Sequence, residues 1–109
     1  MAKRPPKRRP RNEARERERT RQKLAKDREK LFQLEPGGSP ERPLDTATAA
    51  VIEMHATSVP CPHCGGHHEV TEHVALVHRG VRLREAKLRC RQCGTQRSLW
   101  FRIVGPSLN

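Results

Sequence analysis

The sequence predicts a small metal-stabilised β domain of three antiparallel strands, preceded by a disordered basic tail and a charged α-helix. Two observations carry this prediction. The only cysteines form two Cys-x2-Cys pairs, each followed by glycine, and stretches with alternating apolar residues lie between and after the pairs. Only 33% of the chain is hydrophobic and 3% is aromatic, which is too little for a large core. A domain of this size usually needs a metal ion or disulfide bonds to fold.

The tail, residues 1–11, is strongly basic. It contains three prolines and no acid, so it cannot bury a core, and we expect it to be disordered. Residues 1–34 as a whole hold 14 basic and 5 acidic residues, a net charge of +9 within a total of +11. The positive charge is therefore concentrated before the predicted β domain. The basic residues of the tail are Lys3, Arg4, Lys7, Arg8, Arg9 and Arg11.

Residues 12–34 contain neither glycine nor proline and are predicted to form the charged helix. Asn12 is a suitable N-cap, and acidic residues occupy the first turn, where they complement the helix dipole. Near its end the segment carries a short apolar patch, formed by Leu24, Leu31, Phe32 and Leu34. Two interpretations remain open: a solvated helix, or a helix that binds a protein partner through this patch.

Residues 35–57 are predicted to be a linker with one short element. Glycines and prolines at 35–43 end the helix. Residues 45–59 fit two structures. Asp45 could cap a short helix over residues 46–54, whereas the alternation of Ile52, Met54 and Ala56 is typical of a strand. We favour an extended lead-in to the β domain.

The β domain is predicted over residues 58–104, followed by a C-terminal tail, residues 105–109. Residues 70–78 are rich in β-branched side chains, and Arg79-Gly80 favours a tight turn after them. The second strand changes the parity of its apolar residues, which predicts a bulge near Glu85. The third strand covers residues 98–104. For Trp100 we favour packing against the hairpin over stacking on a nucleic-acid base.

The cysteines have the spacing of metal ligands. A Cys-x2-Cys turn places two sulfurs on one side of a tight loop, as two corners of a zinc tetrahedron require. The glycine after each pair can adopt positive φ and turn N–H groups toward the sulfurs. Four thiolates leave no open coordination position, so one structural Zn²⁺ ion is predicted rather than a catalytic one. Its predicted ligands are Cys61, Cys64, Cys90 and Cys93.

Disulfide bonds or a redox role are the alternative use of four cysteines. The basic N-terminus never reaches the apolar stretch of a secretory signal, and no apolar run approaches membrane-spanning length. We therefore expect a reducing location. This would be the cytoplasm, including association with a bacterial nucleoid or ribosome, or the nucleus if the host is a eukaryote. In such a compartment, paired Cys-x2-Cys motifs favour metal over disulfides.

Residues 58–104 resemble the zinc-ribbon superfamily, found in transcription factors, RNA polymerase subunits, ribosomal proteins and many small bacterial proteins. The resemblance implies that the four cysteines bind zinc. The long spacing between the pairs is similar to that in eukaryotic elongation factors that stimulate transcript cleavage by RNA polymerase. Those factors carry adjacent acidic residues at the hairpin tip. The tip here, Arg79-Gly80-Val81-Arg82, has no acid, so that activity is not expected.

Histidines gather around the same hairpin and are alternative metal ligands. One of them could replace a cysteine, or several could form a second, weak site. Because the four cysteines already complete a tetrahedron, we favour surface histidines. The residues concerned are His63, His67, His68, His73 and His78.

The sequence favours a binding protein over an enzyme. It has no Gly-rich phosphate loop, His-Glu-x-x-His motif or nucleophile elbow, so we expect no small-molecule substrate. We expect binding of nucleic acid or a ribonucleoprotein, mainly through phosphates, in a role accessory to transcription or translation. Beside the basic tail, the expected contacts on the ribbon are Arg82, Arg84, Arg89 and Arg91. The alternative is a protein–protein adaptor that docks on a larger assembly such as RNA polymerase.

Overall fold

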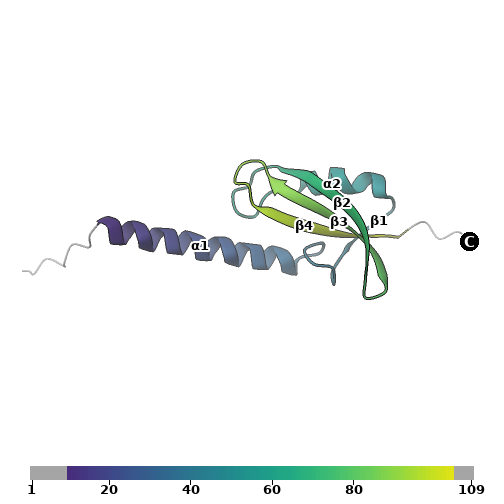
Figure 1. Ribbon diagram of the computed structural model, residues 1–109, viewed down its shortest axis with the longest axis horizontal. Coiled ribbons are helices and arrows are strands. Elements are labelled where there is room, and N and C mark those ends of the chain that lie inside the picture. The colour runs from purple at the N-terminus through teal and green to yellow at the C-terminus, as the bar shows by residue number, and fades with distance from the viewer. Residues whose placement is uncertain (1–9, 105–109) are drawn as a thin grey trace, which may run out of the picture.

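The computed structural model describes residues 10–104. Predictions about residues 1–9 and 105–109, including the tail residues Lys3, Arg4, Lys7, Arg8 and Arg9, lie outside the described residues. In chain order the elements are α1 (Pro10–Leu34), β1 (Leu44–Thr46), the short 3-10 helix η1 (Ala49–Val51), α2 (Ile52–Ser58), β2 (His68–His78), β3 (Val81–Cys90) and β4 (Gln96–Ile103). Figure 1 labels the α-helices and the strands. Within residues 10–104, no helix is long and apolar enough to cross a membrane.

The sheet has four strands in the order β1-β4-β3-β2. The last three strands of the chain pair antiparallel, as predicted, but β1 adds a parallel edge through the register Leu44↔Phe101. The prediction of three antiparallel strands was therefore wrong. A strand of three residues is too short to show alternation in the sequence. β1 forms because the edge of β4 is free to pair with it.

The segment before the first cysteine pair is helical, so the expectation of an extended lead-in was wrong over Ile52–Ser58. Ile52 and Ala56 are fully buried, whereas Met54 between them is 69% exposed. Burial at a spacing of four is helical, since a strand buries every second residue. The alternation in the sequence was consistent with both structures, and packing on β2 and β3 decides between them.

The core lies between one face of the sheet, α2 and the last turn of α1. Phe32 of α1 is 9% exposed and belongs to this core. The expectation that it forms part of an exposed apolar patch was therefore wrong. Leu24, Leu31 and Leu34 remain exposed, at 48%, 62% and 61%. The other buried members of the core are Ile52, Ala56, Ala86, Leu88, Leu99 and Phe101.

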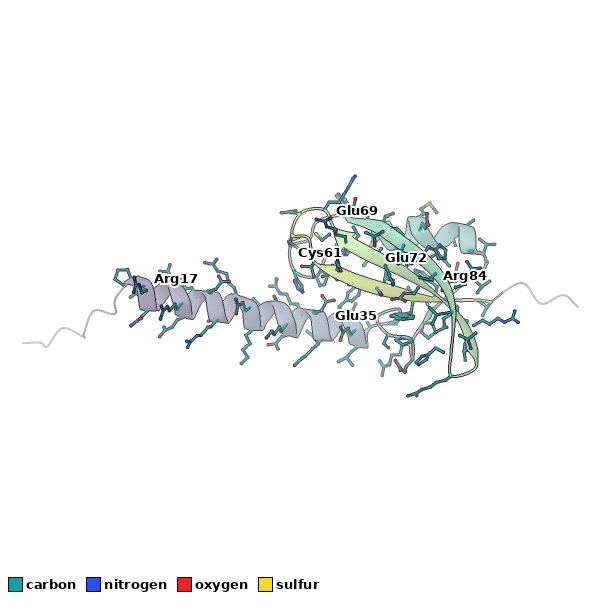
Figure 2. All side chains as sticks on the ribbon, in the orientation of Figure 1. Arg17, Glu35, Cys61, Glu69, Glu72 and Arg84 are labelled. Carbon is teal, nitrogen blue, oxygen red and sulfur yellow. The ribbon has the colours of Figure 1, made fainter. Side chains whose placement is uncertain are left out.

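The rest of α1 extends beyond the β domain, and residues 10–24 are all exposed (Figures 1 and 2). The helix includes Pro10 and Arg11, which were expected to belong to the tail. Proline is well suited to a first helical position, because its fixed φ is helical and it lacks an N–H that would go unpaired there.

The irregularity in the hairpin lies in β2, where the register shifts between Val70 and Glu72, and not near Glu85 as predicted. In β3, Leu83 and Ala86 are both buried although they lie on opposite faces of the sheet. The change of parity therefore needs no inserted residue, and the register with β4 is regular. Trp100 is half-buried and stands outside the core cluster, because its neighbours Leu99 and Phe101 take the inward positions of β4.

Candidate metal centre

The four cysteines come together at one end of the sheet. Their sulfur atoms all lie within 4.8 Å of one another. The Sγ atoms of Cys61 and Cys93 are 3.7 Å apart, and those of Cys64 and Cys90 are 3.4 Å apart. A disulfide requires about 2.05 Å. Sulfurs around one tetrahedral zinc ion, each about 2.3 Å from it, stand about 3.8 Å apart. The group therefore has the dimensions of a metal site with thiolate ligands.

The two cysteine loops, which we call knuckles, have the same backbone geometry. Gly65 and Gly94 have φ values of +74° and +76°, as the motif predicted. Each donates its N–H to the carbonyl of the first cysteine of its pair, at 2.8 and 3.0 Å. Backbone N–H groups also point at the sulfurs, and Cys93 N–H lies 3.4 Å from Cys90 Sγ. These donors stabilise thiolates, which are the metal-binding form of cysteine.

Cys61 is buried beside a cation. Burial by itself would raise the pKa of its thiol, but the N–H groups of Cys64 and His63 and the guanidinium of Arg97 outweigh burial and lower that pKa. The Arg97 Nη1 atom donates to Cys61 Sγ at 3.3 Å. A positive charge this close favours the thiolate and offsets part of the negative charge that four thiolates would carry.

The other thiols influence one another. The N–H of Cys93 is the main cause that lowers the pKa of Cys90, and the hydroxyl of Thr95 is the main cause that lowers the pKa of Cys93. For Cys64, the Gly66 N–H lowers the pKa, but the neighbouring thiols and burial prevail and raise it to about 12. A divalent ion among the sulfurs would favour the thiolate form of all four cysteines.

Arg97 links this cluster to α1. Its side chain is 2% exposed and donates from Nη2 to Glu29 Oε2 at 2.9 Å. It also contacts His68 Nε2. His68 Nδ1 lies 2.6 Å from the Val59 carbonyl oxygen, which can only accept, so Nδ1 carries the hydrogen and Nε2 accepts from the guanidinium. Burial and then Arg97 lower the pKa of His68, in agreement with a neutral ring.

This role of Arg97 was not predicted from the sequence, where the residue counts only toward the positive charge of the chain. One signal was available: Arg97 precedes Leu99 and Phe101 by two and four residues, and alternation places all three on the inward face of β4. Glu29 carried no such signal. The position of Glu29 depends on how the end of α1 docks. Phe32 decides this docking, because its ring packs under the Arg97 guanidinium, whose Cζ atom is 5.6 Å from the ring centroid.

No histidine belongs to the metal-binding group found within residues 10–104. His63, in the first knuckle, places Nε2 3.0 Å from Glu29 Oε2 and so also joins α1 to the metal centre. His73 and His78 stand near Glu53 and Glu41, at 3.5 and 3.3 Å. His67 is exposed, as expected, but His68 is 3% exposed, so the assignment of all five histidines to the surface was wrong.

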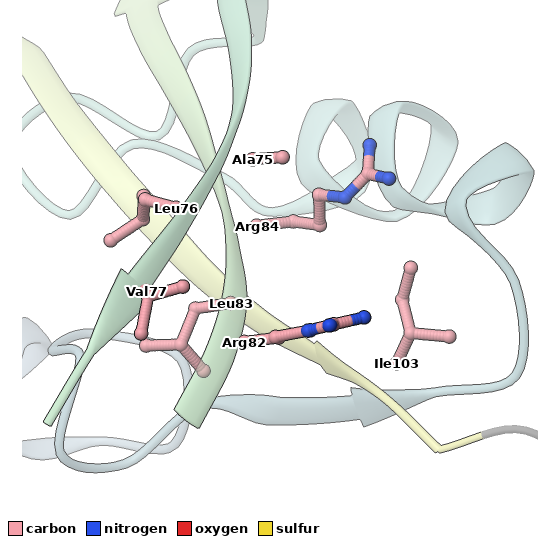
Figure 3. Close-up of a pocket in the computed structure, with 7 residues that line it drawn as sticks. All are labelled: Ala75, Leu76, Val77, Arg82, Leu83, Arg84 and Ile103. Atoms are coloured by element: carbon pink, nitrogen blue, oxygen red, sulfur yellow. The ribbon is translucent and has the colours of Figure 1, made fainter. Parts of the chain in front are cut away.

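The four arginines predicted on the ribbon do not form one patch. Arg82 and Arg84 lie near the hairpin tip, beside a hollow of about 520 Å³ between β3 and Ile103 (Figure 3). Arg89 and Arg91 lie at the knuckle end, where Arg91 Nε is 3.6 Å from Glu69 Oε2. About 23 Å of strand separates Arg82 from Arg89. In Figure 2, the labelled residues Cys61, at the knuckle end, and Arg84 lie toward opposite ends of the sheet.

Known proteins do not identify this chain: no family model matches it, and neither does any curated protein or solved structure. Residues 10–104 thus form a small domain with a four-stranded mixed sheet, two α-helices and a four-cysteine group that could hold a metal ion.

Proposed function

We propose that this protein is a zinc-ribbon protein that binds nucleic acid or a ribonucleoprotein mainly through phosphates, in a role accessory to transcription or translation. Zinc is the proposed metal because four thiolates in a group of this size suit its tetrahedral preference. Cys61, Cys64, Cys90 and Cys93 would hold the ion and close its coordination shell. The zinc would then stabilise the fold without activating water, so the proposed function is not enzymatic.

The observation that carries this proposal is the distribution of charge. Residues 1–34 hold 14 basic against 5 acidic residues, and much of this segment is exposed helix standing clear of the domain. Arg82, Arg89 and Arg91 on the ribbon are exposed, and Arg84 is half-buried. Lysine and arginine that replace the counterions of a phosphate backbone give affinity without sequence specificity. Cysteines that hold zinc must stay reduced, so the proposed location is the reducing interior of a cell.

The proposal is tested by fluorescence anisotropy with labelled DNA and RNA and zinc-loaded full-length protein over a series of salt concentrations. We expect the logarithm of the affinity to fall linearly with the logarithm of salt. Replacement of Lys3, Arg4, Lys7, Arg8 and Arg9 by Gln should reduce the slope by about 4. The double variants Arg82→Gln/Arg84→Gln and Arg89→Gln/Arg91→Gln then report which end of the ribbon contributes.

A control for these variants is Arg102→Gln, because Arg102 already forms an ion pair with Asp45, with Nε 2.9 Å from Oδ1. That substitution should leave the salt slope nearly unchanged. If the unmodified protein binds no nucleic acid at micromolar concentration even at low salt, the proposal is wrong.

The second candidate is a protein–protein adaptor that docks on a larger assembly such as RNA polymerase. It is favoured by Leu24, Leu31 and Leu34, which expose apolar side chains on α1. Phe32 cannot take part, because it is buried in the core. Capture of partners with and without nuclease treatment separates the candidates, since an adaptor keeps its partners after the nucleic acid has been digested.

A further inference from the structure

α1 carries a continuous row of cations, which we call the basic stripe: Arg15, Arg19, Lys23, Lys26 and Lys30. They follow one another at spacings of four, four, three and four residues, so they share one side of the helix. At 1.5 Å per residue, the stripe is about 22 Å long. All five side chains are exposed.

The acids of α1 avoid this side. With about 100° between successive residues, Asn12 and Gln33 are the only other side chains within about 45° of the centre of the stripe. Glu16 and Asp27 both lie outside the stripe, beyond the edge that Lys23 forms. Glu13 and Glu18 pair instead with Arg17 and Arg21, at 3.9 Å each, on the opposite side of the helix.

The stripe also points away from the domain. Phe32 and Glu29 define the side of α1 that docks, and both lie at least about 80° around the helix from the centre of the stripe. Within residues 10–104, no stripe side chain makes an ion pair or hydrogen bond, whereas Arg17 and Arg21 have carboxylate partners. The stripe is therefore exposed, positive and not neutralised from within the described part of the chain.

This arrangement weakens the isolated helix. Like charges at spacings of three and four destabilise a helix by a few tenths of a kcal/mol per pair. Successive members of the stripe are all such pairs. A polyanion along the stripe would offset these repulsions with attraction, so a partner that suits the stripe carries negative charges spaced along a line.

We propose that the basic stripe binds the phosphate backbone of double-stranded DNA, with α1 lying along the major groove. This inference rests on the proposed function and names its contact surface and the class of nucleic acid. A helix about 10–12 Å wide fits the B-form major groove but not the deep, narrow one of A-form RNA. Single strands are usually bound by stacking on aromatic rings, and the stripe has none.

The docked end makes α1 a directed arm. Glu29 contacts both Arg97 and His63, and Phe32 is anchored in the core. The helix therefore leaves the domain in one direction, past the knuckle end of the sheet (Figure 1). A stripe on such an arm meets a duplex in a defined orientation, unlike the same charges on a flexible tail.

The test compares two triple variants of the zinc-loaded full-length protein on a labelled 24-base-pair DNA. The stripe variant is Arg15→Gln/Arg19→Gln/Lys23→Gln. The control is Arg17→Gln/Arg21→Gln/Arg28→Gln, which removes three charges from the opposite side of the same helix. Gln has nearly the helix propensity of Arg and Lys, and circular dichroism checks that both variants keep the helix.

We expect the stripe variant to reduce the salt slope by about 2.7 and the affinity at low salt by tenfold or more. The control should change affinity less than threefold. Equal losses in both variants would show a net-charge effect and overturn the assignment of the stripe. Equal or tighter binding to double-stranded RNA or single-stranded DNA would overturn the choice of duplex DNA. No binding to any nucleic acid by the unmodified protein would instead refute the proposed function itself.

Discussion

At the residue scale, Arg97 holds together parts of the chain that are far apart in sequence. Its guanidinium contacts Glu29 of α1, Cys61 of the metal centre and His68 of β2. A buried cation is tolerated only where acceptors surround it, and a buried acceptor is destabilising once its cation is removed. The docking of α1 and the environment of the four-cysteine group therefore depend on the same side chain.

We expect Arg97→Met to lower the free energy of unfolding by about 3–5 kcal/mol, because Glu29 and His68 lose their shared partner inside the protein. Urea unfolding in excess zinc measures this change. Arg102→Met is the matched control, since it removes the exposed ion pair with Asp45 and should have little effect. Equal destabilisation by both substitutions would contradict the role assigned to Arg97.

The His68 ring predicts a pH dependence of stability. Because burial and Arg97 lower its folded pKa below the ordinary value of 6.5, the unfolded chain binds the proton more readily. Stability should therefore fall as the pH drops through about 6.5, by at most about 1.4 kcal/mol per pH unit from this group. Above that pH the ring has no effect. Melting temperatures between pH 5.5 and 7.5 measure the slope.

His68→Gln should reduce this slope, whereas the exposed His67→Gln should leave it unchanged. Protonation of the thiols also weakens the metal site in acid, but it acts equally in all three proteins. An identical slope in His68→Gln and the unmodified protein would refute the assignment.

At the element scale, the connection after α1 fixes how the helix leaves the domain. Trp100 N–H donates to the Gly37 carbonyl at 2.8 Å, and this bond ties the connection to β4. A Cβ atom at Gly38 would overlap the carbonyl oxygen of Phe32 and lie 2.7 Å from the Cα atom of Gln33. Backbone approaches backbone so closely here that only glycine fits.

Gly38→Ala should therefore displace the last turn of α1 and lower stability by about 1–3 kcal/mol, measured by thermal unfolding. Gly80→Asn provides the comparison. Gly80 has a φ of +79°, a Cβ atom there would have no neighbour within 4 Å, and asparagine tolerates that conformation. Gly38 does not have a positive φ, so a loss there reports the close approach of the backbone. A Gly38→Ala protein as stable as Gly80→Asn would contradict this account.

At the scale of the whole molecule, the domain has a small core and, formed by both knuckles, a four-cysteine group that could hold a metal ion. Ten apolar residues are buried within residues 10–104, and two of them are the cysteines Cys61 and Cys90. The part of the core that is not cysteine is too small to be expected to hold the sheet by itself. Metal binding should therefore be coupled to folding.

We expect native mass spectrometry to find one zinc ion per chain and a zinc chelator to remove the sheet signal in circular dichroism. Restored zinc should restore the signal. Cys90→Ser should lose the ion, and His67→Ala should keep it, because His67 lies outside the four-sulfur group. A metal-free chain with an unchanged melting temperature would contradict this coupling.

The local features of the fold were predictable because they depend on neighbours in the chain. A Cys-x2-Cys-Gly turn requires positive φ at Gly65 and Gly94 wherever it occurs, and both have it. The uninterrupted run that became α1 and the hairpin turn at Gly80 follow from similarly short-range rules. The grouping of the cysteines followed from the chemistry of a small domain that lacks a large core.

The remaining features depend on surfaces that exist only after folding. β1 forms because β4 offers a free edge, and Ile52–Ser58 is helical because Ile52 and Ala56 meet the sheet. Phe32 and Arg97 are buried because two segments more than sixty residues apart come together. Local propensity differs by only tenths of a kcal/mol in such segments, whereas burial of a large side chain contributes about 1.5–3 kcal/mol. Tertiary packing therefore decided where the sequence left two structures open.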